Sequence, residues 1–366
     1  MAEIQTVGNP GGWLARLKES CFYSPAASVL SIALGLVILA VVGFVLNWGV
    51  VNAVWEPNPA ACREASGACW GFVAEKWRLI IFGRFPYELQ WRPGLATIII
   101  VGMLVLSAVP AFWSHKGLRA LLWGWAAAFI AFFVLMRGGV FGLEPIGTDM
   151  WGGLPLTVII TLFGMAASSP LGVLLAIGRR SQMPVISAVS TGYIELVRGV
   201  PLITVLFVAT FVFPLLLPEW LQCDAFWRVA IGIALFQAAY MAETVRGGLQ
   251  TIPQGQYSAA RSLGLTERQC YQHVILPQAL VAIIPAFVNS LLSCFMDTSL
   301  VTVVSMYDLT GSLKLALGDA VWRAYFIEGY VFIVMVYFVA SFIISRYSQW
   351  LELRLKGAKS RRVVRI

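Results

Sequence analysis

Long apolar runs separated by shorter polar segments dominate the pattern along the chain. Seven of them are uncharged and long enough to cross a bilayer as helices. The pattern predicts an all-α polytopic membrane protein with about eight transmembrane helices. The runs lie at about 28–49, 95–113, 120–136, 153–178, 201–217, 279–296 and 329–345, with a shorter eighth run at 229–242.

Composition and charge agree with this class. Charged residues make up 12% of the chain and the mean hydropathy is +0.80, whereas a soluble domain carries roughly twice that share of charge. The net charge of +8 does not indicate a nucleic-acid partner, because membrane proteins retain Lys and Arg in their cytoplasmic loops. If both termini are cytoplasmic, most of the 26 basic residues lie on the cytoplasmic side of the membrane, so this is the predicted topology. The basic tail, residues 351–366, would also suit anionic membrane lipid.

A polar stretch at about 246–278 separates two of the apolar runs. We expect Gly247–Gly248 to break the preceding helix. Pro253 suits the start of a new short helix, because the missing N–H would be unpaired there anyway. Gly264 fits the end of that helix, where a left-handed conformation is common.

A second short helix is predicted directly afterwards. Thr266 and Gln269 have the spacing of a capping box, in which each side chain bonds to the backbone of the other residue. Pro277 is expected to end this helix. The stretch therefore predicts a compact helix-turn-helix between two membrane spans.

This stretch resembles the cytoplasmic loop of ATP-binding-cassette importer permeases. That family has Glu-Ala-Ala, then Gly, then a hydrophobic residue and Pro, and this chain has Ser258-Ala259-Ala260, Leu263-Gly264 and Ile275-Leu276-Pro277. Ser258 stands where the family usually has Glu. The preceding residues 246–256 resemble the polar amino acid branch. The resemblance implies a helix that docks on an ATPase, with the following residues: Gly255, Gln256, Tyr257, Ser258, Ala259, Ala260, Arg261, Leu263 and Gly264.

The resemblance covers about 151–350 and implies a five-helix importer-permease core there. Residues 1–150 are then an extension with three helices and a large periplasmic loop at about 50–93. The whole chain looks like the M-type permease of general L-amino acid importers. That likeness implies a bacterial inner membrane and three kinds of partner: a Q-type second permease, ATP-binding subunits and a periplasmic amino acid binding protein.

ATP cannot bind to this chain through a P-loop, which needs a Gly-Lys pair followed by Ser or Thr. No lysine of the chain follows a glycine. The chain is therefore predicted to be no enzyme and to hold no cofactor, with ATP and Mg bound by a partner subunit. A secondary amino acid transporter is the alternative, although neither an internal repeat nor clear ion-coupling residues are found. A membrane-bound enzyme is a second, more remote alternative.

Polar residues inside the predicted helices mark a candidate substrate pathway, because a charge within a span is costly and needs a reason. Asn289, Ser293 and Asp297 recur four apart on one helical face. The family pattern here is Lys-Asp-Thr-Ser-Leu, so Thr298 and Ser299 join the candidates, and Met296 replaces the Lys. The alternative is a polar stripe that holds helices together.

Charged residues also lie near the ends of two predicted helices. At the end of the first, Tyr240 and Glu243 are further candidates for the substrate pathway, although Glu243 can also simply pair with Arg246. Glu195 and Arg198 are three apart, can pair, and precede Gly199 and Pro201, where one helix is expected to end and another to begin. They are candidates for gating or for an interface, and a solvated ion pair is the alternative.

Residues 301–304 are too apolar for a loop and predict a re-entrant or broken segment.

The cysteines and histidines indicate no metal site. No cysteine pair has zinc spacing, and only two histidines are present. Cys62 and Cys69 lie in the aromatic-rich outer loop, which can pack as a small cap. A disulfide is allowed there, and two free thiols are the alternative.

Overall fold

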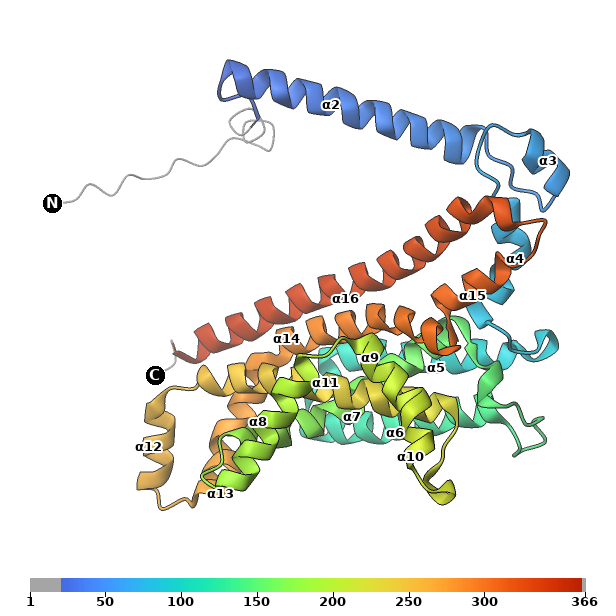
Figure 1. The fold of residues 1–366 in the computed structure, drawn as a ribbon. Coiled ribbons are helices and arrows are strands. Elements are labelled where there is room, and N and C mark those ends of the chain that lie inside the picture. The colour runs from blue at the N-terminus through green and yellow to red at the C-terminus, as the bar shows by residue number, and fades with distance from the viewer. Residues whose placement is uncertain (1–20, 364–366) are drawn as a thin grey trace. The chain divides into compact units, whose positions relative to one another are not determined.

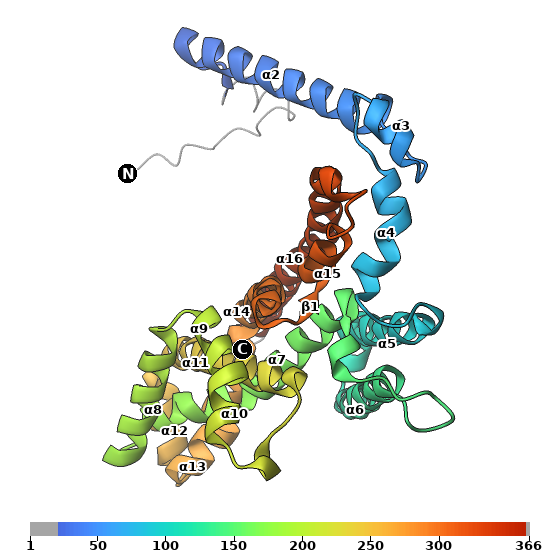
Figure 2. The same cartoon turned by 45° about the vertical axis from the view of Figure 1, so that its right-hand side comes forward.

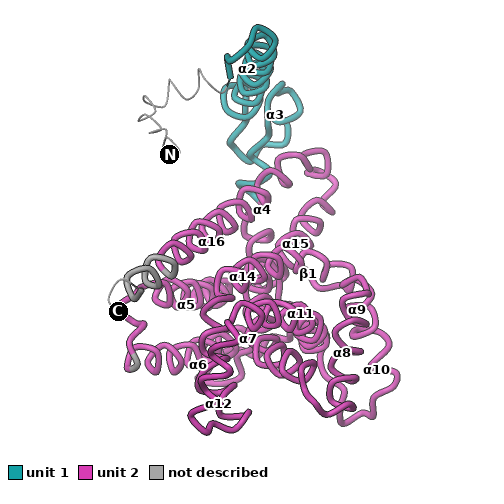
Figure 3. The backbone as a smooth tube through the Cα atoms, turned by 90° about the vertical axis from the view of Figure 1, so that its left-hand side faces the viewer, with its two compact units in different colours: residues 1–75 teal, residues 76–366 magenta. Residues whose placement is uncertain are grey.

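The computed structural model describes residues 21–363, apart from the side chains of residue 115 and of residues 355–363. The predicted basic side chains at the extreme N-terminus and most of those in the tail lie outside this description. The chain forms two compact units, residues 1–75 and 76–366 (Figure 3). In chain order, the elements of the first unit and the helix that leaves it are α2 (Pro25–Leu46), η1 (Asn47–Val51), α3 (Pro59–Glu64) and α4 (Gly71–Phe82).

Helices make up nearly all of the second unit as well, so the prediction of an all-α polytopic membrane protein is confirmed. Seven described helices are long and apolar enough to cross a membrane, and one bent pair would make an eighth. The elements are η2 (Tyr87–Leu89), α5 (Trp91–Ala108), η3 (Pro110–Trp113), α6 (His115–Arg137), η4 (Thr148–Met150), α7 (Gly153–Arg179), α8 (Pro184–Arg198), α9 (Leu202–Phe207), η5 (Val208–Val212), α10 (Phe213–Leu216), η6 (Glu219–Leu221), α11 (Ala225–Gln250), α12 (Gln254–Ser262), α13 (Glu267–Cys270), η7 (Tyr271–Ile275), α14 (Leu276–Asp297), η8 (Thr298–Val304), β1 (Tyr307–Asp308), α15 (Leu309–Ala316), η9 (Arg323–Tyr325) and α16 (Phe326–Val363).

The first unit ends in a small, cross-braced loop. Cys62 in α3 and Cys69 are joined by a disulfide. The Trp70 indole N–H donates to the Gly49 carbonyl over 2.7 Å, and its ring stacks on Trp55 with 6.0 Å between ring centres. Two aromatic residues of this loop, Trp55 and Trp70, therefore pack on each other.

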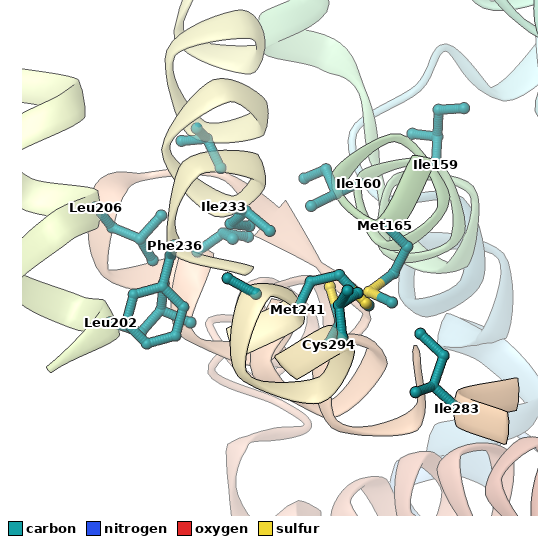
Figure 4. Packing of buried hydrophobic residues seen from close by; sticks show 14 of the residues in the cluster. Ile159, Ile160, Met165, Leu202, Leu206, Ile233, Phe236, Met241, Ile283 and Cys294 are labelled. Atoms are coloured by element: carbon teal, nitrogen blue, oxygen red, sulfur yellow. The ribbon is translucent and has the colours of Figure 1, made fainter. Parts of the chain in front are cut away.

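The second unit is built around α7 and α11, which pack along each other with α14 against both (Figure 1). Glycines allow the close approach: a side chain at Gly172 would collide with Met241. Membrane helices gain no hydrophobic driving force from associating in lipid, so they rely on close van der Waals packing. Small residues at their interfaces allow that close packing. Figure 4 shows Ile160 and Met165 of α7 near Ile233 of α11 and Cys294 of α14.

The other helices flank this core. In Figure 2, α8, α9 and α10 lie on one side of α7, and α5 and α6 lie on the other. Arg92 of α5 is fully buried and donates to the carbonyl oxygens of Leu135 (2.6 Å) and Glu144 (2.9 Å). These bonds use the Arg92 side chain to hold the end of α6 and the loop after it.

A sharp elbow separates α8 from the next helical segment. α8 ends at Arg198 with Gly199 as its cap, and α9 begins after Pro201, as predicted. The apolar runs had placed a membrane span here only at about 201–217 and none directly before Gly199. In the structure, α8 and the helical segment Leu202–Leu216 together are apolar and long enough for one span, and they are bent by 105° to each other. Pro201 cannot donate a backbone hydrogen bond and favours an extended predecessor, which explains the break.

Two predicted helix breaks are wrong. α11 continues through Gly247–Gly248 to Gln250, because Gly248 is buried against Ala279 and Ile283, where a side chain would not fit. Pro277 likewise lies inside a helical path that runs from Glu267 to Val304. The π-helical turn η7 lies just before Pro277 and absorbs its missing N–H.

The segment after α14 is broken, as residues 301–304 suggested. Ser305 adopts a left-handed conformation (φ 64°), and Tyr307–Asp308 then forms bridges with Gly152 and Gly153 at the start of α7. The buried Asp308 carboxylate accepts hydrogen bonds from the Thr302 hydroxyl (2.7 Å) and the Gly311 N–H (2.9 Å). Burial raises the pKa of Asp308, and these hydrogen bonds oppose the shift.

Candidate functional site

The polar face of α14 remains open in the described structure. Asn289 and Ser293 are exposed, and Asp297, one turn further on, is partly buried. The Gln237 amide of α11 lies 3.5 Å from an Asp297 oxygen, and the side chain of Gln237 is itself buried. Gln237 was not predicted, because a lone glutamine in an apolar run gives no signal of which helix it faces.

Asp297 has no cationic partner in the described part of the chain. Among the described residues, no Lys or Arg forms an ion pair with it. Its neighbour Met296, which replaces the lysine of the family pattern, is 48% exposed and supplies no charge. A carboxylate within a membrane span is costly unless it meets water, a cation or hydrogen-bond donors. The open face of α14 is therefore suited to a positively charged group.

The two residues after Asp297 are more enclosed. Thr298 is fully buried, and its hydroxyl donates to the Phe295 carbonyl over 2.8 Å. Ser299 is half-buried. Thr298 therefore lies inside the fold, whereas Asn289 and Ser293 lie on the open face.

A network of five charged side chains joins the ends of α7, α8 and α11. Glu243 lies at its centre, 2.6 Å from Arg179, 2.8 Å from Arg246 and 3.7 Å from Arg198. Arg179 also binds Glu195 over 2.8 Å. The expected Glu243–Arg246 pair is present. Glu195, however, pairs with Arg179 rather than with Arg198, because the end of α7 brings a closer guanidinium.

Tyr240 lies between the polar face and this charged network. The Arg198 guanidinium lies 5.6 Å from the centre of the Tyr240 ring, and Phe236 packs against the same ring at 5.0 Å. Gln237 and Glu243 are six residues apart on α11, which is about 9 Å along the helix. One helix thus carries contacts to Asp297 at one level and to three arginines at another.

The loop that resembles the family's cytoplasmic loop lies at one end of the bundle, with α15 at the opposite end (Figure 1). Within α12, Tyr257 and Ala260 are buried, and the Tyr257 ring meets Tyr271 at 6.1 Å. These two residues hold α12 against the fold. Leu263, by contrast, is 81% exposed. The remaining exposed candidates are Gly255, Gln256, Ser258, Ala259, Arg261 and Gly264.

Both predicted caps of this loop are present. Gly264 has φ 77°, and its N–H donates to the Arg261 carbonyl over 2.9 Å. Thr266 and Gln269 form the reciprocal bonds of a capping box. The turn between α12 and α13 is therefore fixed by local chemistry that the sequence specifies.

No metal-binding group of three or more His, Cys, Asp or Glu side chains occurs in the described part of the chain. The candidate site consists instead of an open polar face, a charged network and an exposed helical loop. Such an arrangement can bind, hold and release a polar solute.

Comparison with known proteins assigns the family. Residues 168–357 match the model of the binding-protein-dependent transport system inner membrane component. The chain is 40% identical to the inner membrane amino-acid ABC transporter permease protein YhdY of Escherichia coli, over 94% of this chain and 93% of that protein. It is 32% identical to the glutamate/glutamine/aspartate/asparagine transport system permease protein BztC of Rhodobacter capsulatus, over 94% of each.

A solved structure supports the same assignment. The crystal structure of an amino acid ABC transporter with histidines has 29% sequence identity and a TM-score of 0.50, and the match covers 55% of this chain and 92% of that one. The predicted resemblance is confirmed: the chain belongs to the inner membrane components of binding-protein-dependent transport systems, as a multi-pass permease of the amino acid ABC transporter class.

Proposed function

We propose that this chain is a permease subunit of an ATP-driven importer for L-amino acids. It forms the translocation pathway with a second, Q-type permease, and both of its termini are cytoplasmic. The two relatives that match over nearly the whole chain are amino acid permeases, and the family description names dependence on a binding protein. Family membership also disfavours the alternative of a secondary transporter.

The observation that carries the pathway is the Asp297 carboxylate, which forms no ion pair with any described residue and lies beside the exposed Asn289 and Ser293. An L-amino acid has an ammonium group that complements this carboxylate, while hydroxyl and amide side chains can hydrogen-bond its other polar atoms. The role of the chain is to bind and pass on the solute. Glu195 and Arg198, held in the charged network, act at the gate.

Energy enters through the exposed loop. ATP and Mg are bound by partner subunits, and the exposed surface of α12 with Leu263 docks on them. Tyr257 and Ala260 anchor α12 to the permease, so movement of the ATPase is transmitted to the bundle rather than lost in the loop. A periplasmic binding protein delivers the amino acid at the opposite end.

The test replaces Asp297 with Asn in the full complex, reconstituted in liposomes. Asn keeps the shape and can still hydrogen-bond, so a purely structural contact should survive. We expect the Asp297→Asn complex to assemble and hydrolyse ATP at the basal rate while uptake falls at least about tenfold, the loss of one charge-assisted contact. Ser293→Ala and Asn289→Ala should give smaller defects.

Asp149→Asn is the matched control, because it removes an exposed carboxylate outside the spans. It should leave uptake unchanged. Normal uptake by the Asp297→Asn complex would return Asp297 to the role of a helix-packing contact. Uptake by wild type that follows an ion gradient without ATP would refute the ATP-driven function.

A further inference from the structure

A groove of about 620 Å³ lies between α4 and α5, away from the polar face of α14. Its lower part belongs to the membrane span Tyr87–Ala108, and its upper part to α4, which comes just before that span. The groove is lined by Trp77, Arg78, Phe82, Gln90, Trp91, Gly94, Leu95 and Ile98.

The upper end of the groove holds one precisely oriented cation. The Arg78 guanidinium lies 3.3 Å from the centre of the Tyr87 ring. Its Nε donates to the Gln90 side chain and its Nη2 to the Tyr87 carbonyl, each over 2.7 Å. Nη1 donates to no acceptor within the described residues. A guanidinium fixed in this way has already lost its rotamer freedom, and its Nη1 can still donate to one more oxygen.

The lower end is apolar and open. Leu95 is 42% exposed and Ile98 is 69% exposed. Gly94 carries no side chain at the floor of the groove, and a methyl group placed there would lie 3.7 Å from the Phe82 ring, at van der Waals distance. Trp77 and Trp91 lie between the two ends, both about half exposed, as tryptophans do at the level of lipid headgroups.

We propose that this groove binds one phospholipid from the leaflet at the N-terminal end of α5. The phosphate is held by Arg78, the glycerol region lies beside Trp77 and Trp91, and an acyl chain lies along Leu95 and Ile98. This order of cation, aromatic ring and apolar surface matches the order of chemical groups along a phospholipid. Because the lower end is part of a membrane span, acyl chains are what surround it.

A second groove on the same helix provides a comparison. It has a volume of about 320 Å³, lies between α5 and α6, and is lined by Ile99, Gly102, Met103, Leu106, Gly124, Ala127, Ala128 and Ala131. It has no charged residue, so any lipid contact there has no means of recognising a phosphate. A comparison of the two grooves therefore distinguishes recognition of a phosphate from apolar contact alone.

The experiment measures lipid retained by the purified full-length permease in its complex, by native mass spectrometry after titration. Phosphatidylglycerol is compared with diacylglycerol of the same acyl chains, which lacks the phosphate. We expect one phosphatidylglycerol to be retained at concentrations where diacylglycerol is not. Arg78→Gln should weaken that retention at least about tenfold, because a charge-assisted bond is lost. Gly94→Leu should abolish it by filling the floor.

Gly102→Leu is the control, with the same substitution on the same helix but in the uncharged groove. Its retention of phosphatidylglycerol should equal that of wild type. A phosphatidylglycerol with a photoactivatable acyl chain should label the peptide that contains residues 91–98. Equal retention of the two lipids, wild-type retention by Gly94→Leu in an assembled complex, or labelling confined to other helices would each overturn the proposal.

Discussion

Glu243→Gln tests how much the charged network contributes to the fold. The Glu243 side chain is only 16% exposed, and it accepts bonds from Arg179 at 2.6 Å and from Arg246 at 2.9 Å. Gln can still accept one bond, but its amide N–H groups would face the other guanidinium. Three arginines would then share a single carboxylate, that of Glu195.

The expected cost follows from the burial of the partners. A hydrogen bond to a charged group contributes about 1.5–3 kcal/mol, and breaking a fully buried ion pair costs about 3–5 kcal/mol. Arg198 and Arg246 are each 37% exposed, so water screens part of the change. We therefore expect Glu243→Gln to lower the free energy of unfolding by about 2–3 kcal/mol.

The assay is reversible unfolding of the permease in mixed micelles, with Arg179→Gln as the partner in a double-mutant cycle. The interaction energy of a contacting pair is typically about 0.5–3 kcal/mol, and this pair should lie in the upper half of that range. Glu195→Gln is the matched control, because Glu195 is 59% exposed and should cost no more than about 1 kcal/mol. Equal costs for Glu243→Gln and Glu195→Gln would refute the reasoning.

Three further outcomes follow from glycines and cysteines. Gly264→Val forces a β-branched residue into a left-handed conformation, so it should weaken association with the ATPase in pull-down assays. Gly102→Val, at a glycine of α5 with open space around it and outside the loop, should not. Gly172→Ala pushes against Met241 and should cost about 1–3 kcal/mol in micelle unfolding, whereas Gly192→Ala meets open space and should not destabilise. Mass spectrometry of unreduced peptides should find Cys62 joined to Cys69, and free alkylation of both would contradict this.

Local signals in the sequence predicted much of this structure. The apolar runs located the spans, and the caps at Gly264 and Thr266 formed as expected because each depends on residues within one turn of the chain. The helix end before Pro201 was predicted for the same reason. Caps and helix ends of this kind depend only on residues that are close together in the chain, so a short segment of sequence is enough to predict them.

Tertiary pairing could not be predicted in the same way. Glu195 has an arginine three residues away, yet it binds Arg179, 16 residues earlier, because the ends of α7 and α8 are brought together. The contact of Gln237 with Asp297 crosses 60 residues. Gly248 was misjudged for a related reason, because its neighbours Ala279 and Ile283 come from another helix. Each outcome depends on which helices pack together, and an apolar pattern does not specify that.

The unbroken helical path from Glu267 to Asp297 has a mechanical consequence. Its 31 residues make a lever about 45 Å long, with the turn that follows α12 at one end and the Asp297 carboxylate at the other. A tilt of about 10° around its midpoint displaces the far end by about 4 Å, which is more than the whole 3.5 Å separation of Gln237 and Asp297. The π-helical turn η7 lies near the loop and Pro285 lies inside α14, so the lever has two places between the loop and Asp297 where it can bend.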